Sequence, residues 1–124
     1  MLKFLIVDDD KEESLLIQTH LENCGYSFDV YNFPKEALVK IQKRENEPNI
    51  LIVDLNMPEI NGIQFVTKMR DAGLDIPVIL TCTDPDKELV DKTINMGLDR
   101  ILHKPIQKDE LLAEIKEIQE EYDL

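Results

Sequence analysis

The sequence has few of the residues that cross-linked, zinc-binding or membrane-spanning proteins need. Its two cysteines, Cys24 and Cys82, lie far apart and form no CxxC pair. We therefore expect neither a structural disulfide nor a zinc site, and a reducing, cytoplasmic location is the expected one. No apolar run approaches the ~20 residues of a membrane helix. The opening MLKFLIVDDD turns acidic after a very short apolar stretch, so we expect no signal peptide and no membrane anchor.

Positive charge is also scarce. Fourteen Lys and Arg residues face twenty-six Asp and Glu residues, which gives a formal net charge of −12. Such a chain repels a phosphate backbone, so direct nucleic-acid binding is not expected. Repeats, low-complexity tracts and linkers are absent from the sequence as well. A length of 124 residues fits one globular domain over residues 1–124.

Short apolar runs alternate with helical patterns, which predicts five strand–helix units. The expected strands are Leu2–Val7, Ser27–Tyr31, Asn49–Val53, Pro77–Thr81 and Ile101–His103. The expected helices begin after Asp10, at Pro34, near Gly62, at Asp84 and Pro85, and near Gln107; the fourth has an apolar stripe of Leu89, Val90, Thr93 and Ile94. Because repeated units of this kind favour right-handed crossovers, we predict an α/β fold with a doubly wound, five-stranded parallel sheet.

Four of the predicted strands end in polar residues, which would meet at one edge of the sheet. These residues are Asp8, Asp9 and Asp10 after the first strand, Asp54 after the third, Thr81 in the fourth and Lys104 after the fifth. Clustered carboxylates repel one another, and a bound cation relieves that repulsion. Because the available ligands are oxygen atoms, a hard ion such as Mg²⁺, or Mn²⁺, is favoured over zinc.

The remaining groups at this edge suit phosphoryl transfer. Lys104 offers a positive charge that can pair with Asp54 or with a phosphate, and Thr81 offers a hydroxyl donor. A carboxylate nucleophile, a metal ion and a cationic side chain are the parts that an aspartyl-phosphate intermediate requires. No Ser–His or Cys–His arrangement in the sequence competes with this interpretation.

In four segments, IVDDD, IVDLNMPEING, ILTCT and HKPI, the chain resembles the response-regulator receiver domains of two-component signalling, and the resemblance covers essentially its whole length. It implies a flavodoxin-like (βα)5 receiver fold over residues 1–124, with no output domain visible. It also implies a phosphorylation-dependent switch that accepts a phosphoryl group from a histidine kinase or histidine phosphotransfer protein. Such a domain is no enzyme for an external substrate, although it assists its own phosphorylation and dephosphorylation.

The resemblance assigns a role to each matching residue. Asp54 would be the phosphoacceptor, and Asp9 a direct metal ligand with Asp8 assisting, often through water. The backbone carbonyl of Asn56 would complete the protein ligands. Thr81 would be the switch hydroxyl that is drawn towards the phosphoryl group. Lys104 would be the lysine that contacts the phosphoryl group. In this family, the residue at the position of Pro105 commonly follows a cis peptide bond.

The sequence departs from the family at Ile101, where a Tyr or Phe is common three residues before the lysine. Isoleucine has no ring and no hydroxyl, so we expect phosphorylation without strong aromatic coupling to the output face. That face, formed by the fourth helix, fifth strand and fifth helix, would bind a downstream protein. In the family, the positions of Asn56 and Thr83 tune the lifetime of the phosphoryl group. Asn56 could help to position an attacking water, whereas Thr83 would position it poorly, so the sequence does not predict the lifetime.

Two other functions stay open on the sequence alone. An Mg²⁺-dependent phosphohydrolase also uses an aspartyl-phosphate, but such enzymes commonly carry a second acid where this chain has Asn56. A receiver-like adaptor with little phosphorylation is the other. Three neighbouring residues are assigned structural roles: Asp10 as a helix N-cap, His20 as a partly buried helix residue, and His103 as a strand residue.

Overall fold

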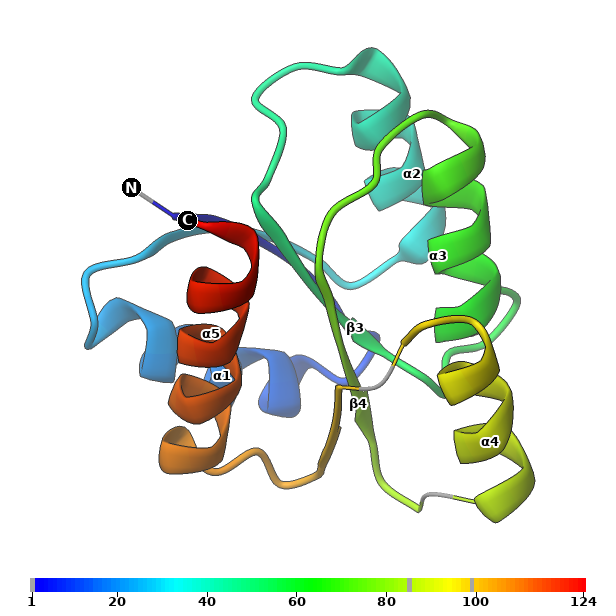
Figure 1. The fold of residues 1–124 in the computed structure, drawn as a ribbon. Helices are drawn as coiled ribbons and strands as arrows, with labels where there is room; N and C mark the ends of the chain where they lie inside the picture. Colours follow the sequence, from blue (N-terminus) through cyan, green and yellow to red (C-terminus); the bar gives the residue numbers. More distant parts are fainter. Residues whose placement is uncertain (1, 85, 99) are drawn as a thin grey trace.

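The computed structural model describes residues 2–84, 86–98 and 100–124, and in them five strands alternate with five helices (Figure 1). The elements are β1 (Lys3–Val7), α1 (Lys11–Glu22), β2 (Ser27–Tyr31), α2 (Pro34–Lys43), β3 (Ile50–Asp54), α3 (Gly62–Asp71), β4 (Val78–Cys82), α4 (Lys87–Asn95), β5 (Ile101–His103) and α5 (Lys108–Tyr122). All strand pairs are parallel, in the order β2-β1-β3-β4-β5. The predicted five-stranded parallel sheet is confirmed.

Helices cover both faces of the sheet. In Figure 1, α1 and α5 lie on one side, and α2, α3 and α4 lie on the other. Two separate apolar clusters fill the two interfaces, one under each group of helices. After β1 the chain moves outwards to β2 and then returns to β3 on the other side of β1. The carboxyl ends of β1 and β3 are therefore the switch point at which ligands bind in open sheets of this kind.

The continuous apolar run of β3 is explained by burial on both faces. All five of its residues are buried, and successive residues belong alternately to the two clusters. Leu51 and Val53 face α2 and α3, whereas Ile50 and Ile52 face α1 and α5. A strand that is covered on both sides needs apolar residues at every position, which is why the sequence shows no alternation here.

Capping residues and proline in the sequence mark the starts of the first two helices. Asp10 is the N-cap of α1 and accepts hydrogen bonds from the backbone N–H groups of Glu12 and Glu13, as predicted. Pro34 is the first residue of α2. The fourth helix differs, because its N-cap is Asp86 rather than Asp84, and Pro85 lies outside the described residues.

The predicted stripe of the fourth helix and the limits of three strands need correction. Ile94 does not face the core, since 52% of it is exposed, while Thr93 is fully buried. Both β3 and β4 begin and end one residue later than predicted, so Asp54 and Cys82 are strand residues, and β1 begins at Lys3 rather than Leu2. None of the described helices has the length and apolar character that crossing a membrane requires.

Candidate functional site

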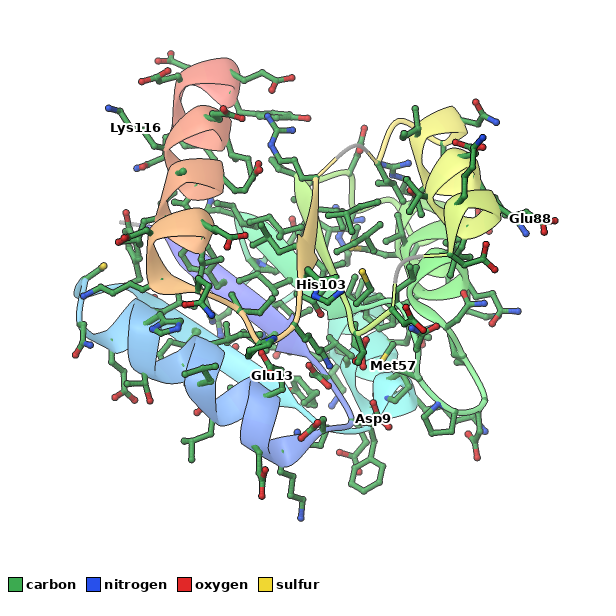
Figure 2. All side chains as sticks on the ribbon, turned by 90° about the horizontal axis from the view of Figure 1, so that it is seen from below. Asp9, Glu13, Met57, Glu88, His103 and Lys116 are labelled. Atoms are coloured by element: carbon green, nitrogen blue, oxygen red, sulfur yellow. The ribbon has the colours of Figure 1, made fainter. Side chains whose placement is uncertain are left out.

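The candidate site lies at the carboxyl ends of the strands. Figure 2 views the molecule from this end, with Asp9 and Met57 labelled near the site. Asp8 and Asp9 directly follow β1, and Asp54 is the last residue of β3. The backbone N–H of Asp8 donates to Tyr31 O at 3.1 Å, which continues the pairing with β2 beyond the strand. The side chain of Asn32 donates to Asp8 O at 2.7 Å. The turn that carries the first two acids is thus held by backbone and side-chain bonds.

Strand alternation explains why the polar groups meet. Along β1, Phe4 and Ile6 belong to the cluster under α1 and α5, so Asp8 continues that face while Asp9 continues the opposite one. The same alternation places Asp54 after Ile50 and Ile52, Thr81 after Ile79, and Lys104 after Leu102. Four strands therefore direct a polar side chain to the α1/α5 side of the sheet, and Asp9 approaches from the other side.

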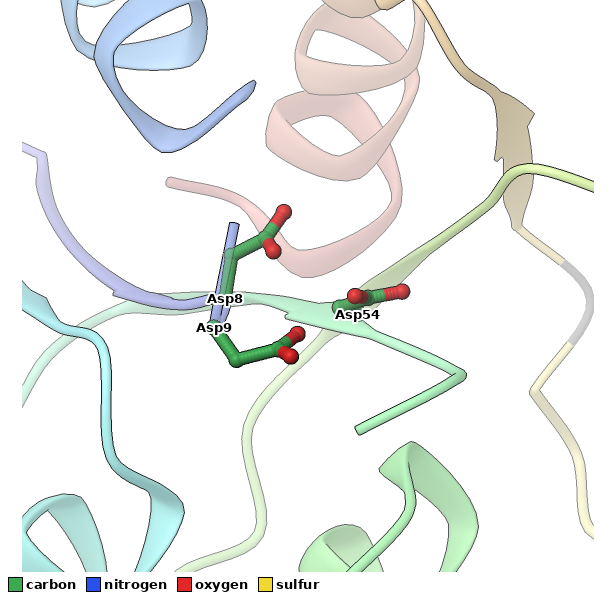
Figure 3. Close-up of side chains that lie close together, drawn as sticks. All are labelled: Asp8, Asp9 and Asp54. Carbon is green, nitrogen blue, oxygen red and sulfur yellow. The ribbon is translucent and has the colours of Figure 1, made fainter. Parts of the chain in front are cut away.

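Asp8, Asp9 and Asp54 form a cluster of carboxylates (Figure 3). One oxygen from each lies within 4.8 Å of the others. Asp8 and Asp54 are only 1% and 4% exposed, whereas Asp9 is exposed. The cluster is therefore buried on the side of Asp8 and open to solvent on the side of Asp9.

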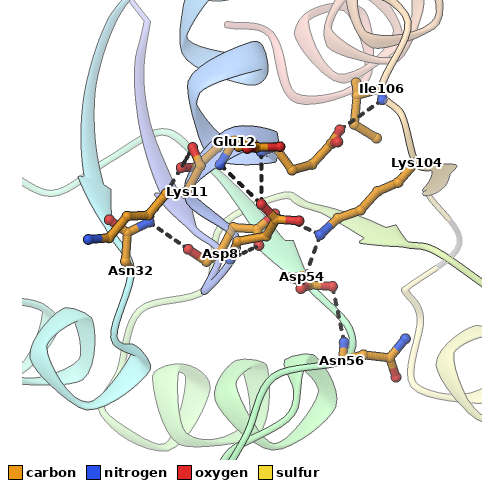
Figure 4. Close-up of polar contacts among 11 residues, drawn as sticks. Asp8, Lys11, Glu12, Asn32, Asp54, Asn56, Lys104 and Ile106 are labelled. Carbon is orange, nitrogen blue, oxygen red and sulfur yellow. Dashed lines mark hydrogen bonds and ion pairs between the residues drawn. The ribbon is translucent and has the colours of Figure 1, made fainter.

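Lys104 supplies the positive charge of the site (Figure 4). Its Nζ lies 3.0 Å from Asp8 Oδ2 and 3.1 Å from Asp54 Oδ2. Its backbone N–H donates to Cys82 O at 2.7 Å, and the bond to Pro105 is cis, as the resemblance implied. Three carboxylates against one ammonium leave two negative charges unbalanced when all are ionised.

Backbone N–H groups hold one oxygen of each buried carboxylate. Asp8 Oδ1 accepts from the N–H of Asp10 at 2.9 Å, and Asp54 Oδ1 accepts from the N–H of Asn56 at 3.1 Å. The other oxygen of each carboxylate faces Lys104. These bonds fix the orientation of both carboxylates before any ligand arrives.

Thr81 is buried beside Asp54, and its hydroxyl makes no hydrogen bond within the described part of the chain. The two residues are register partners on β3 and β4. Within the described part of the chain, Thr81 Oγ1 is among the buried side-chain oxygens that have no hydrogen-bond partner. A buried unpaired hydroxyl is unfavourable, so this atom is a donor available to a ligand at Asp54.

The electrostatics of the cluster favour proton or cation binding. Burial raises the pKa of Asp54 above its ordinary value, and the neighbouring charge of Asp8 raises it further. Burial likewise raises the pKa of Asp8, and burial together with Asp54 raises that of Asp9. Burial alone would lower the pKa of Lys104, but the two carboxylates outweigh it and the pKa lies above its usual value. The ionised cluster is therefore under repulsion that a divalent cation would relieve.

The loop after Asp54 is packed closely against the first turn of α3. A Cβ on Gly62 would lie 2.8 Å from Asp54 O and 2.9 Å from Leu55 Cα, both backbone atoms. The N–H of Gly62 donates to Leu55 O at 3.0 Å, and the N–H of Leu55 donates to Thr81 O at 2.8 Å. Glycine at this position allows the helix to approach the acceptor strand.

The structure brings together Asp8, Asp9, Asp54, Thr81 and Lys104, the residues that the sequence placed at this edge. All-oxygen donors and surplus negative charge fit Mg²⁺ or Mn²⁺. Sequence reasoning paired Lys104 with Asp54 alone and missed its contact with Asp8. The alternation of Phe4, Ile6 and Asp8 along β1 was the signal that could have revealed this contact.

The three structural assignments can be compared with the geometry. Asp10 caps α1, as described above. His20 is half-buried, and its Nε2 lies 3.0 Å from Ile106 O. His103 is exposed, and its Nδ1 lies 2.8 Å from Lys104 O. Among the described residues, no hydrogen bond or ion pair joins either histidine to the carboxylates of the site.

Residues 4–116 match the family model of the response regulator receiver domain. The chain is 34% identical over 112 residues to the response regulator SaeR of Staphylococcus epidermidis, a match that covers 90% of this chain and 48% of that protein. It is 33% identical over 116 residues to the response regulator MprA of Mycobacterium leprae, covering 93% and 50%. The chain thus spans about half the length of these relatives.

Solved structures agree with the family match. The CheY-like receiver domain protein of Methanospirillum hungatei superimposes with a TM-score of 0.88 at 26% identity, covering 99% of this chain and 97% of that one. The receiver domain of the Francisella response regulator 1452 does so with a TM-score of 0.85 at 29% identity, covering 98% and 99%. With its fold, its cluster of acids and these matches in agreement, the chain belongs to the response-regulator receiver domain family of two-component systems.

Proposed function

We propose that Asp54 is the phosphoacceptor of this domain and takes a phosphoryl group from a histidine kinase or histidine phosphotransfer protein. One observation carries the proposal. The Asp54 carboxylate is buried and oriented by the N–H of Asn56 and by Lys104, and it lies next to the unpartnered hydroxyl of Thr81. This is a nucleophile with a cation and a hydrogen-bond donor already beside it.

In the proposed reaction, an oxygen of Asp54 attacks the phosphorus of a phosphohistidine. The new O–P bond forms as the P–N bond breaks, and the electron pair of that bond stays on the departing imidazole. Lys104 can then exchange its contact with the Asp54 carboxylate for one with a phosphoryl oxygen, and Thr81 Oγ1 can donate to another. Both groups stabilise the charge on the phosphoryl oxygens.

The metal assignment is part of the same proposal. Asp8, Asp9 and Asp54 would hold Mg²⁺, or Mn²⁺, together with the backbone carbonyl of Asn56, Asp9 binding directly and Asp8 assisting. When bound, the ion supplies positive charge that offsets the repulsion between the carboxylates and the incoming phosphoryl group. The solvent-exposed side of the cluster, at Asp9, is where an ion and a donor would enter.

Output would follow from a change at the α4–β5–α5 face, where we expect a downstream protein to bind. Ile101 is half-buried at the start of β5 and, like Leu89 and Met96, packs against the apolar cluster under α2, α3 and α4. A branched aliphatic side chain lacks the two-state ring that commonly links the switch hydroxyl to this face. We therefore expect a modest shift of the face on phosphorylation.

The test is phosphorylation by acetyl phosphate with Mg²⁺, followed by intact-mass spectrometry. The wild-type chain is expected to gain the mass of one phosphoryl group, and Asp54→Asn to gain none. Asp71→Asn is the matched control, because Asp71 is exposed at the end of α3, and it should behave like wild type. No gain with this donor or with a phosphorylated histidine kinase would contradict the proposal and favour an adaptor. Many turnovers of an external phosphoester would favour a phosphohydrolase.

A further inference from the structure

The segment that carries Lys104 is bonded to α1 at Ile106. Glu13 Oε1 accepts a hydrogen bond from the backbone N–H of Ile106 at 2.9 Å, a bond drawn to that nitrogen in Figure 4. His20 Nε2 donates to the carbonyl oxygen of Ile106 at 3.0 Å. Both backbone polar groups of one residue are therefore bound by side chains from the same helix.

The two side chains are suited to act together because they lie on one face of α1. His20 follows Glu13 by seven positions, which is about two helical turns. Between them, Ile17 is fully buried in the cluster under α1 and α5, and Ile106 is a buried member of the same cluster. Apolar packing thus fixes the distance between the helix and the segment, and the two hydrogen bonds fix its orientation.

On its other side, the segment is fixed to the sheet. The N–H of Lys104 donates to Cys82 O, and Ile106 follows two residues later. The Lys104 side chain then reaches both Asp8 Oδ2 and Asp54 Oδ2 at salt-bridge distance. A lysine has a long and flexible side chain, so a contact with two acids at once depends on where its backbone is held.

We propose that Glu13 and His20 are positioning residues that hold the Ile106 backbone and thereby keep Lys104 Nζ between Asp8 and Asp54. The inference rests on the proposed function of Asp54 and adds two residues to it. Neither residue touches the reacting atoms. Their effect on phosphorylation must therefore pass through Lys104, and this dependence separates the proposal from a general contribution to folding.

The experiment is a double-mutant cycle on the rate of phosphorylation by saturating acetyl phosphate and Mg²⁺. Glu13→Ala and His20→Ala are each expected to lower the limiting rate, by up to the roughly hundredfold that a misplacement of about 1 Å can cost. In a Lys104→Ala background, the same substitutions should cause little further loss, because the group that they position is gone. Full additivity in that background would overturn the proposal.

Two conservative variants show whether the hydrogen bonds are responsible. Glu13→Gln keeps an acceptor oxygen and His20→Gln keeps a donor nitrogen, so both should retain most of the wild-type rate. Glu12→Ala and Glu22→Ala are the controls, since they make similar changes at exposed positions on the same helix. Rates of these controls as low as that of Glu13→Ala would contradict the positioning role.

A second measurement separates positioning from damage to the site. The apparent dissociation constant of Mg²⁺ should not rise in Glu13→Ala, because the carboxylates stay in place and lose only competition from Lys104. Weaker Mg²⁺ binding would indicate general disruption and overturn the proposal. If the wild-type chain accepts no phosphoryl group, the proposed function fails, and the positioning role fails with it. If the wild-type chain is phosphorylated but the double-mutant cycle is additive, only the positioning role fails.

Discussion

Substitution of Gly62 by alanine should impair both the fold and the phosphoacceptor. Gly62 is the first residue of α3, and its Cα faces the backbone of Asp54 and Leu55. An added Cβ would meet Asp54 O at 2.8 Å, Leu55 Cα at 2.9 Å and the Asp54 carbonyl carbon at 3.3 Å. Backbone atoms cannot rotate away as a side chain can, so either the helix or the acceptor strand must move.

The magnitude follows from two opposing effects. Overpacking at a site of this kind costs about 1–3 kcal/mol. Alanine also restricts the unfolded chain, which returns about 0.4–1 kcal/mol where the backbone angles suit it. The backbone angle at Gly62 is not in the positive range, so the second effect applies here. We expect a net loss of about 1–2 kcal/mol of unfolding free energy.

Urea unfolding without Mg²⁺ measures the stability, and the acetyl phosphate reaction measures the acceptor. Gly25→Ala is the matched control, because its Cβ would meet nothing within 4 Å although its φ of +76° is strained. It should lose about 1 kcal/mol of stability and keep the wild-type rate. The reasoning is refuted if Gly62→Ala is as stable as wild type, or if it keeps the wild-type rate at reduced stability.

Four further predictions concern the charges and the output. Mg²⁺ should raise the unfolding free energy by about 2.7 kcal/mol at a hundred times its dissociation constant, since it binds only the folded site. Thermal melts with and without EDTA measure this gain. An equal gain in Asp9→Asn would contradict the metal assignment. Without metal, Asp54→Asn should be more stable than wild type, because it removes a buried charge beside Asp8. The pKa values of Asp8, Asp9 and Asp54 are all raised above 3.8 in the folded state, so the stability that these groups contribute is present at low pH and is lost as the pH rises through their folded values. Metal-free wild type should therefore gain stability as the pH falls through the raised pKa values of these groups, and urea midpoints measured at a series of pH values should show a smaller gain in Asp54→Asn. Ile101→Tyr should enlarge the phosphorylation-dependent NMR shifts on the α4–β5–α5 face; unchanged shifts and unchanged partner binding would contradict the role assigned to Ile101.

Much of the fold was predictable because the sequence encodes each element locally. The apolar run of β3, the N-cap Asp10 and Pro34 at the start of α2 each have a direct physical cause that needs no knowledge of the rest of the chain. The fourth helix was harder, because its predicted stripe placed both Thr93 and Ile94 towards the core. Only the packing of the whole helix shows that Thr93 is buried and Ile94 is not.

The site was predictable as a set of residues but not as a set of contacts. The carboxyl ends of parallel strands meet whatever lies between them in sequence, so Asp54, Thr81 and Lys104 could be grouped from their places at the ends of predicted strands. The second partner of Lys104, Asp8, depends on which face of β1 each acid continues. The bonds from Glu13 and His20 to Ile106 join positions 93 and 86 residues apart, and no local pattern indicates them.

Localising the phosphoryl group tests the central claim most directly. The wild-type chain would be phosphorylated with acetyl phosphate and Mg²⁺, reduced with borohydride to mark the acyl phosphate, digested and sequenced by tandem mass spectrometry. The account predicts that the mark lies at Asp54 and disappears when Mg²⁺ is replaced by EDTA. A mark at another carboxylate, or an equal yield without Mg²⁺, would contradict it.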